Sequence, residues 1–142
     1  MTAKVKVYFD SDVIISSLIS NKGAAHILLK TAEIKPWVSD LQKKELRTVA
    51  GRLKLDLEKL EVLFDNRLNS VRVKKTEVKI KKRFLKYVLD QNDAQIAAGI
   101  AASKPAFFVS YNQRHFLADK IKIDFKVICL TPAQLLQHLR SR

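Results

Sequence analysis

The sequence predicts an α/β fold in which a central, mainly parallel sheet lies between two layers of helices. Strand-like and helix-like segments alternate along the 142 residues, and several strands are continuous apolar runs such as "AFFVS". Strands of that kind are typical of a parallel sheet covered on both faces. The three glycines and three prolines are scattered, without a repeat or a linker, which predicts a single domain over residues 1–142.

The first half of the chain is predicted to contain two strands and four helices. In "KVKVYFD" apolar residues occupy alternate positions, which indicates a strand. The runs "VIISSLIS" and "GAAHILLKTAEI" are compatible with helices. A short strand, "KPWVSD", opens at Pro36, and Ser39 or Asp40 can cap the helix "LQKKELRTVAGRL". The fourth helix, "LDLEKLEVLFDNRL", carries Leu57, Leu60 and Phe64 at helical spacing.

The second half is predicted to alternate three strands with three helices. The strands are "SVRVK", "AFFVS" and "KVICL". Thr76 can cap the helix "TEVKIKKRFLKYVL", and Asn92 can cap "NDAQIAAGIAAS", which ends before Pro105. The last helix, "TPAQLLQHL", has Thr131 as its cap and Pro132 at its first position.

The net charge indicates a polyanionic partner. The 27 lysines and arginines against 14 aspartates and glutamates give a formal charge of +13 and a pI near 10. So basic a surface attracts nucleic acid by releasing its counterions, although the same charges can simply keep a surface solvated. The charged start of the sequence resembles neither a membrane span nor a secretory signal, so we expect a cytoplasmic protein without a membrane partner. Cys129 lies in an apolar run and is expected to be a buried thiol.

Three acidic residues from separate segments are predicted to point inward. Asp10 follows the first strand directly, and α/β folds bind ligands at the carboxyl ends of their strands. Glu45 lies four residues from Leu41, on the apolar face of its predicted helix. Asp93 lies on the same face of a later helix as Ile96. We therefore expect the three carboxylates to converge.

Two of these acids, Asp10 and Asp93, also have a purely structural interpretation. Asp10, Ser11 or Asp12 can cap the following helix. Asp93 can stabilise the first turn of its helix through the helix dipole. Inward-facing acids, however, are seldom buried unless they are paired, and converging carboxylates are relieved by protonation, a basic side chain or a divalent cation. Oxygen ligands without nearby histidines or cysteines predict Mg²⁺ or Mn²⁺, held by Asp10, Glu45 and Asp93.

Four segments in chain order carry a family pattern. "VYFDSDVII" has an apolar strand followed by Asp-Ser-Asp, "KKEL" lies within a helix, and "NDAQIAAGIA" and "FFVSYNQRHF" follow. Together they resemble the motifs of the PIN domain, a nuclease family that includes the VapC-type toxins of prokaryotic toxin–antitoxin pairs. The matching positions are Asp10, Ser11, Asp12, Glu45, Asp93, Ser110 and Asn112.

The resemblance implies a three-layer α/β/α fold, metal-dependent cleavage of RNA, frequent homodimers and often an antitoxin partner. It assigns the metal to Asp10, Glu45 and Asp93, with Ser11 orienting a ligand or phosphate. Asn112 replaces a frequent fourth acid and is expected to act as a polar auxiliary, which weakens the binding of a second cation. Asp12 or Asp90 could make up the missing charge, and Ser110 matches the last motif.

Basic residues are concentrated between Arg67 and Lys86, where Glu77 is the only acid. So one-sided a run is hard to explain by ion pairs within a helix. It predicts an RNA-binding surface, with a solvated face or an antitoxin-docking face as alternatives. The RNA-binding candidates are Lys79, Lys81, Lys82, Arg83, Arg114 and His115.

The predicted function is that of a metal-dependent endoribonuclease, in which a metal-activated water attacks the phosphorus. One alternative is a PIN-like RNA-binding protein that has lost turnover because Asn112 and Tyr111 alter the second metal position. Another is a domain that binds Mg²⁺ and accepts phosphate on an aspartate, as response-regulator receivers do. The receiver hypothesis also requires a lysine late in the chain, and "LTPAQLL" offers none.

Overall fold

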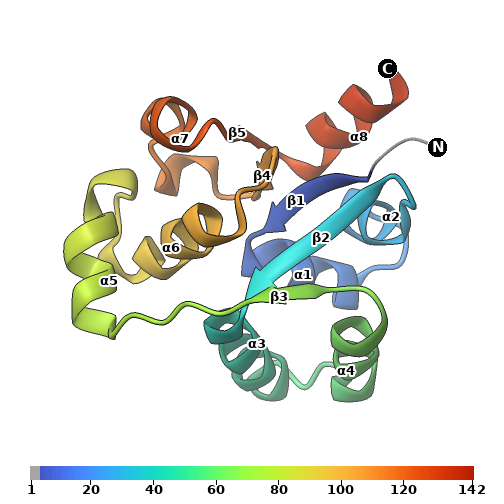
Figure 1. Cartoon of the computed structure of the whole chain (residues 1–142). Coiled ribbons are helices and arrows are strands. Elements are labelled where there is room, and N and C mark those ends of the chain that lie inside the picture. Colours follow the sequence, from blue (N-terminus) through green and yellow to red (C-terminus); the bar gives the residue numbers. More distant parts are fainter. Residues whose placement is uncertain (1–3) are drawn as a thin grey trace.

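The computed structural model describes residues 4–142, and its centre is a five-stranded sheet in which every neighbouring pair of strands is parallel (Figure 1). The strand order is β3-β2-β1-β4-β5. The strands are β1 (Val5–Phe9), β2 (Ile34–Ser39), β3 (Asn69–Val71), β4 (Phe107–Val109) and β5 (Ile128–Leu130). The strand order reverses between β1 and β4, and in such sheets this is where ligands bind.

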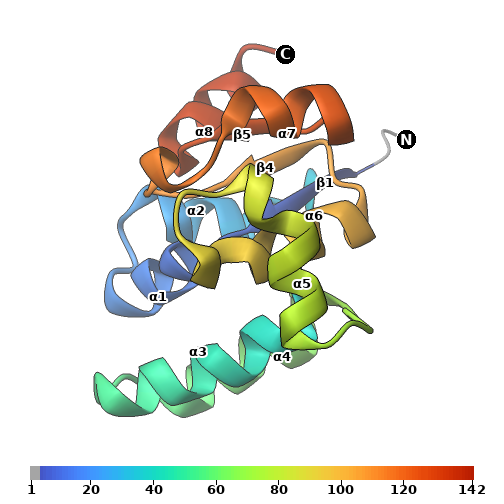
Figure 2. The ribbon, with the colours of Figure 1, turned by 90° about the vertical axis from the view of Figure 1, so that its left-hand side faces the viewer.

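Helices cover both faces of the sheet. The core of one face is formed with α1 (Ser11–Ile19), α2 (Ala24–Lys30), α3 (Asp40–Arg52), α4 (Leu57–Asn66) and α8 (Pro132–Arg140). The core of the other face is formed with α5 (Glu77–Phe84), α6 (Ala94–Ser103) and α7 (Ala118–Phe125). Figure 2 shows the molecule from the side of α5, with α3 and α4 at one end and α7 and α8 at the other. The predicted three-layer α/β/α fold is confirmed.

The central strand β1 supplies side chains to both cores. Val7 and Phe9 pack in the first core and Tyr8 in the second, and all three are 0% exposed. Successive side chains of a strand point to opposite faces, so a strand in the middle of a covered sheet buries both sets. The alternation of polar and apolar residues in "KVKVYFD" therefore reflects the half-buried start of the strand, whereas Val7 to Phe9 are fully buried.

Several elements differ in extent from the prediction. The predicted strand "SVRVK" ends at Val71, so residues 72–74 lie outside the sheet, and the predicted helix "GAAHILLKTAEI" ends at Lys30, because Ile34 belongs to β2. Strand β2 begins at Ile34 rather than at Pro36, because Val5 to Val7 pair with this early part of β2. A proline is tolerated there because β3 pairs only with residues from Trp37 onward, which leaves the start of β2 as an edge on that side. Helix α5 ends at Phe84 and continues as a short 3₁₀ helix, Leu85–Tyr87.

Two local predictions were incomplete or wrong. Helix α7 was not predicted, because Ile121, Ile123 and Phe125 alternate in the manner of a strand. Only Ile121 of the three is fully buried, so the helix packs on the core through a narrow apolar face. Asn92 does not cap α6, which begins at Ala94 after a 3₁₀ helix, Gln91–Asp93. Within residues 4–142, no helix combines the length and the apolar character needed to cross a membrane.

Candidate active site

Asp10 lies at the carboxyl edge of the sheet, where β1 and β4 end side by side. Its backbone N–H donates to the carbonyl of Val109 at 3.0 Å, which continues the pairing of the two strands by one residue. The residue is 8% exposed. Its Oδ1 accepts from the backbone N–H of Ser11 at 2.8 Å, and its Oδ2 accepts from Ser110 Oγ at 2.7 Å. Asp10 is thus the cap of α1 and also a buried acid at the ligand-binding edge.

Burial raises the pKa of Asp10 to about 7. The negative charge of Asp12 also contributes to this raised pKa, and the hydrogen bonds from Ser110 and Ser11 act in the opposite direction. A carboxylate with so high a pKa gains free energy from any positive charge placed beside it. Among the residues that the structure describes, no basic side chain contributes to the pKa of Asp10, so its carboxylate lacks a cationic partner among the side chains around it.

Asp12 contacts the segment that follows β4 and lies close enough to Asp10 for the two carboxylates to influence each other. Its Oδ2 accepts from the backbone N–H of Tyr111 at 3.1 Å, whereas its Oδ1 is buried and has no hydrogen-bond partner. Burial raises the pKa of Asp12 as well. Asp12 lines a groove of about 410 Å³ between α1 and α3, together with Ile15, Ser11 and Glu45.

Glu45 does not lie on the buried face of α3, contrary to the prediction. The buried residues of that helix are Gln42, Leu46 and Ala50, and Glu45 is exposed. Its Oε2 accepts from Gln95 Nε2 at 2.7 Å, which joins α3 to α6. The helix is rotated relative to the predicted face, and this rotation places Glu45 on a cleft wall instead of in the core.

Asp93 stands between the 3₁₀ helix Gln91–Asp93 and α6, with its side chain 26% exposed. Its Oδ2 lies 3.5 Å from His115 Nδ1. Burial raises the pKa of Asp93, a protonated His115 would lower it, and the charges of Asp90 and Glu45 raise it. Glu45 on α3 and Asp93 before α6 therefore lie within electrostatic reach of each other.

A cleft of about 390 Å³ brings these acids together, and we call it the acidic cleft. Four acidic residues from different parts of the chain line it: Asp10, Glu45, Glu77 and Asp93. Ser11, Gln95, Lys75 and Lys81 also line it. Glu77, which the sequence analysis did not select, belongs to the first turn of α5 and lies 3.0 Å from Lys81 Nζ.

The other candidates surround this cleft without lining it. Ser110 is 0% exposed and acts on Asp10 through its hydroxyl. Asn112 is exposed, and its backbone N–H donates to Ser110 Oγ at 2.9 Å. Asp90 is exposed and accepts from the backbone N–H of Asn92. The structure therefore does not place the Asn112 amide beside the three acids.

Gln42 is the main residue that the sequence analysis missed. It is 0% exposed. Its Nε2 donates to the carbonyl of Phe9 at 2.8 Å and to Ser11 Oγ at 3.3 Å. Its Oε1 accepts from the backbone N–H of Ser39 at 2.9 Å and from the hydroxyl of Tyr8. Gln42 thus ties α3, which carries Glu45, to the end of β1.

A sequence signal for Gln42 was present. Ser39 and Gln42 have the spacing of a capping box, S-x-x-E/Q, in which the two side chains bond each other's backbone N–H groups. The structure contains that box at the start of α3. The pattern predicts the cap, but it does not predict that the same amide also reaches Phe9 and Ser11.

The predicted basic residues lie on and near α5. Lys79, Lys82 and Arg83 are exposed along that helix, whereas Lys81 is half-buried and lines the acidic cleft. Arg114 and His115 are exposed on a 3₁₀ helix, Gln113–His115, after β4. His115 reaches the site through Asp93.

The acidic cleft fits a hydrated divalent cation better than a directly ligated one. Within residues 4–142, no three acidic, histidine or cysteine side chains are grouped closely enough to hold an ion directly. Mg²⁺, however, dehydrates reluctantly and is commonly held by one or two carboxylates with several waters. The raised pKa values of Asp10 and Asp93 and the volume of the cleft suit such a cation.

Comparison with known proteins identifies the fold. No protein-family model and no curated protein match the sequence. A chain of a toxin–antitoxin complex from Klebsiella pneumoniae is 16% identical with a TM-score of 0.64, over 89% of this chain and 97% of that one. A chain of VapBC2 from Rickettsia felis, solved with a promoter DNA fragment, is 14% identical with a TM-score of 0.61, over 89% and 98%.

A chain of FitAcB from Neisseria gonorrhoeae is 15% identical with a TM-score of 0.57, over 89% of this chain and 97% of that one. These likenesses show the fold, and at such low identities they show nothing of the chemistry. The chain therefore shares its α/β fold with these chains of toxin–antitoxin complexes, in agreement with the fold predicted from the sequence.

Proposed function

We propose that the protein is a metal-dependent endoribonuclease of the PIN type and the toxin of a toxin–antitoxin pair. The observation that supports this most is the acidic cleft, in which acids from four separate parts of the chain meet. They do so in a protein whose net charge is +13. A basic surface gathers RNA, and an acidic cleft within it suits a divalent cation that meets the phosphodiester.

The side chains of the cleft have distinct roles in this proposal. Asp10, Glu45 and Asp93 would hold Mg²⁺ or Mn²⁺, partly through water. When bound, the ion supplies positive charge to the phosphate and lowers the pKa of a coordinated water. Ser110 fixes the Asp10 carboxylate by its hydrogen bond, and Gln95 fixes Glu45 in the same way.

The remaining polar residues orient the substrate or the acids. His115 lies 3.5 Å from Asp93 and, when protonated, partly neutralises it. Ser11, held by Gln42, faces the cleft and can donate its hydroxyl to a phosphate oxygen. Lys81 lines the cleft, while Lys79, Lys82, Arg83 and Arg114 extend the positive surface beyond it.

An antitoxin partner is part of the proposal because the similar solved structures are toxin–antitoxin complexes. Expression of the chain alone should arrest growth, and co-expression of a small protein encoded next to it should restore growth. Normal growth with an expressed, folded and wild-type chain would oppose the toxin role. Dimerisation and a cytoplasmic location stay predictions, and sedimentation of the purified chain tests the first.

A direct test measures cleavage of RNA by the purified protein with Mg²⁺ or Mn²⁺ and with EDTA. Asp10→Asn, Glu45→Gln and Asp93→Asn should each reduce cleavage by at least about 10-fold, because even the outer partners of a metal site contribute about 10- to 100-fold. Asp119→Asn is the matched control, since Asp119 is an exposed acid on α7. Cleavage that persists in EDTA, or that the control reduces equally, would contradict the proposal.

A second candidate function is RNA binding without turnover. The position of Asn112 favours it, because this residue stands where the family often has a fourth acid and it does not line the acidic cleft. Glu77 lines the cleft in its place, from a different element. The two functions separate cleanly, because a binding protein would retain RNA in a gel-shift assay and yield no product at any metal concentration.

A further inference from the structure

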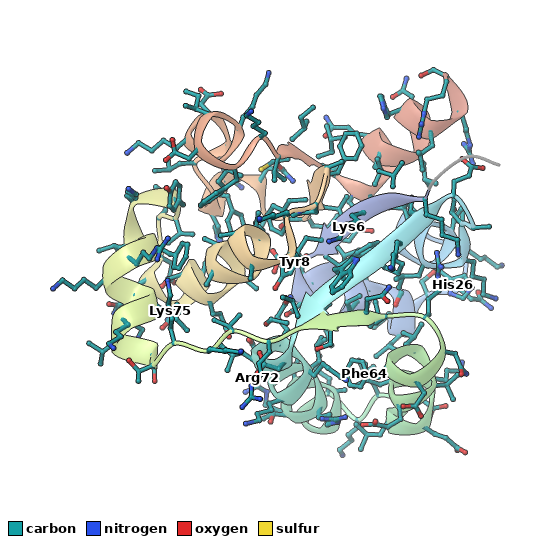
Figure 3. All side chains as sticks on the ribbon, viewed as in Figure 1. Lys6, Tyr8, His26, Phe64, Arg72 and Lys75 are labelled. Carbon is teal, nitrogen blue, oxygen red and sulfur yellow. The ribbon has the colours of Figure 1, made fainter. Side chains whose placement is uncertain are left out.

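A second cavity, of about 540 Å³, lies next to the acidic cleft, along the segment 72–76 that joins β3 to α5. Its basic residues are Arg72, Lys74 and Lys75, and all three are exposed. Figure 3 labels Arg72 and Lys75, which lie on this segment. Lys75 lines the acidic cleft as well, so the two cavities are adjacent.

The segment is held in place although it is neither helix nor strand. Asp40 Oδ1 accepts from the backbone N–H of Val73 at 3.1 Å and from that of Leu41 at 3.0 Å, which tethers the segment to the start of α3. The Val73 side chain is half-buried against the core beneath α5 and α6. Its two neighbours, Arg72 and Lys74, are exposed, which is the alternation of extended backbone and places both on one side.

The charge of this cavity is strongly positive at short range. Its one acidic residue within the described chain is Asp40, and Oδ1 of that side chain already accepts two backbone N–H groups. Arg72 and Lys74 lie two residues apart, or about 6.6 Å along extended backbone. That spacing is comparable to the spacing of successive phosphates in a single strand. Lys75 Nζ lies 5.4 Å from the centroid of the Phe84 ring, which positions its ammonium group.

We propose that segment 72–76 forms a groove for the backbone phosphates of single-stranded nucleic acid. It would receive the phosphates next to the one that is cleaved in the acidic cleft, so its role in cleavage rests on the proposed function. Lys75 connects the groove to the cleft. Positively charged grooves of this kind follow the backbone without reading the bases. The groove therefore contributes affinity and register but little base preference.

The first test measures binding. The cleavage-deficient Asp10→Asn protein is titrated with a labelled single-stranded RNA about 12 nucleotides long, over a range of salt concentrations. Adding Arg72→Gln and Lys74→Gln should weaken binding and reduce the slope of log K against log salt by about 1.4, or about 0.7 for each lost phosphate contact. The same change is expected with the matching DNA strand, since only phosphates are contacted.

The matched control removes two exposed cations from elements on the other face of the sheet. Lys30→Gln, on α2, and Arg140→Gln, on α8, lower the net charge by the same amount. The control should leave the salt slope nearly unchanged. Equal slopes in the two double variants, or a loss confined to RNA, would overturn the groove. Circular dichroism verifies that both double variants are folded.

The second test separates the groove from the proposed function. In the protein with an intact acidic cleft, Arg72→Gln with Lys74→Gln should raise KM for the long RNA and leave cleavage of a dinucleotide unchanged. An equal loss of cleavage on both substrates would contradict the proposed groove but not the proposed function. If the wild-type chain cleaves neither substrate, the proposed function fails, while the binding test still decides the groove.

Discussion

Replacing Gly99 by alanine should destabilise the protein, because the new methyl group would overlap the end of Tyr8. A Cβ atom at position 99 would lie 2.5 Å from Tyr8 Cζ and closer still to the hydroxyl oxygen. Tyr8 is 0% exposed, and its hydroxyl donates to Gln42 Oε1. The tyrosine can therefore yield only by breaking that hydrogen bond or by moving α6 away from the sheet.

The magnitude follows from three contributions. Overpacking of a core costs about 1–3 kcal/mol. A buried hydroxyl left without its partner costs a further 1–3 kcal/mol, roughly. Alanine in place of glycine within a helix returns about 1 kcal/mol. The net loss is about 3 kcal/mol, and the unfolding temperature should fall by about 10 °C in a chain of this length. Urea unfolding followed by Trp37 fluorescence measures it.

The chain provides its own control. Gly51 lies in α3, and a Cβ atom there would meet nothing within 4 Å, so Gly51→Ala should stabilise the protein by about 1 kcal/mol. Gly99→Ala should also cost less in a Tyr8→Phe background, where the closest overlapping atom is absent. If Gly99→Ala is as stable as Gly51→Ala, then Tyr8 and Gln42 do not form the rigid contact described here.

Three further predictions concern ionisable groups. Burial raises the pKa of Asp10 from 3.8 to about 7, so in EDTA the protein should lose stability as the pH rises through that interval. In Asp10→Asn this pH-dependent loss of unfolding free energy should be smaller, by at most about 4 kcal/mol. Urea unfolding at several pH values measures the difference. Ser110→Ala removes a hydrogen bond that lowers the pKa of Asp10, so the acid limb of the cleavage pH profile should move to higher pH; an unshifted limb would contradict this role. Cys129 is half-buried and not fully buried as predicted, but burial still raises the pKa of its thiol to about 11, so the thiol should react with a disulfide reagent far more slowly in the folded than in the urea-unfolded protein.

Those parts of the site that depend on strand ends could be predicted from the sequence. Asp10 follows an apolar strand, Ser110 follows another, and parallel strands bring their carboxyl ends to one edge of the sheet. The direct hydrogen bond between these two side chains additionally requires that β1 and β4 be neighbours. Whether β1 pairs with β4 depends on the strand order, and the alternation of helices and strands along the sequence does not specify that order.

The rotation of α3 could not be predicted from its own residues. Leu41 and Val49 favour a buried face that includes Glu45, but the structure buries Gln42 instead. A fully buried glutamine is acceptable because its amide is paired with Phe9, Ser11, Ser39 and Tyr8. Tyr8 and Phe9 belong to β1 and Ser11 follows it closely, so three of these four partners lie more than thirty residues earlier in the chain. Periodicity within one helix contains no information about them.

The arrangement of charges separates binding from chemistry. A bare acidic cleft repels the phosphate that it is proposed to cleave, so the strand must be held by cationic side chains, namely Lys75 and Lys81 in the lining of the cleft and the cations next to them. A divalent cation then offsets the acids at the reacting phosphate alone. Salt should consequently weaken RNA binding by competing with the lysines, whereas EDTA should stop cleavage and leave most of the binding intact. If EDTA instead abolished binding at low salt, the cation would be the main attachment point for RNA, and the basic surface would have another purpose.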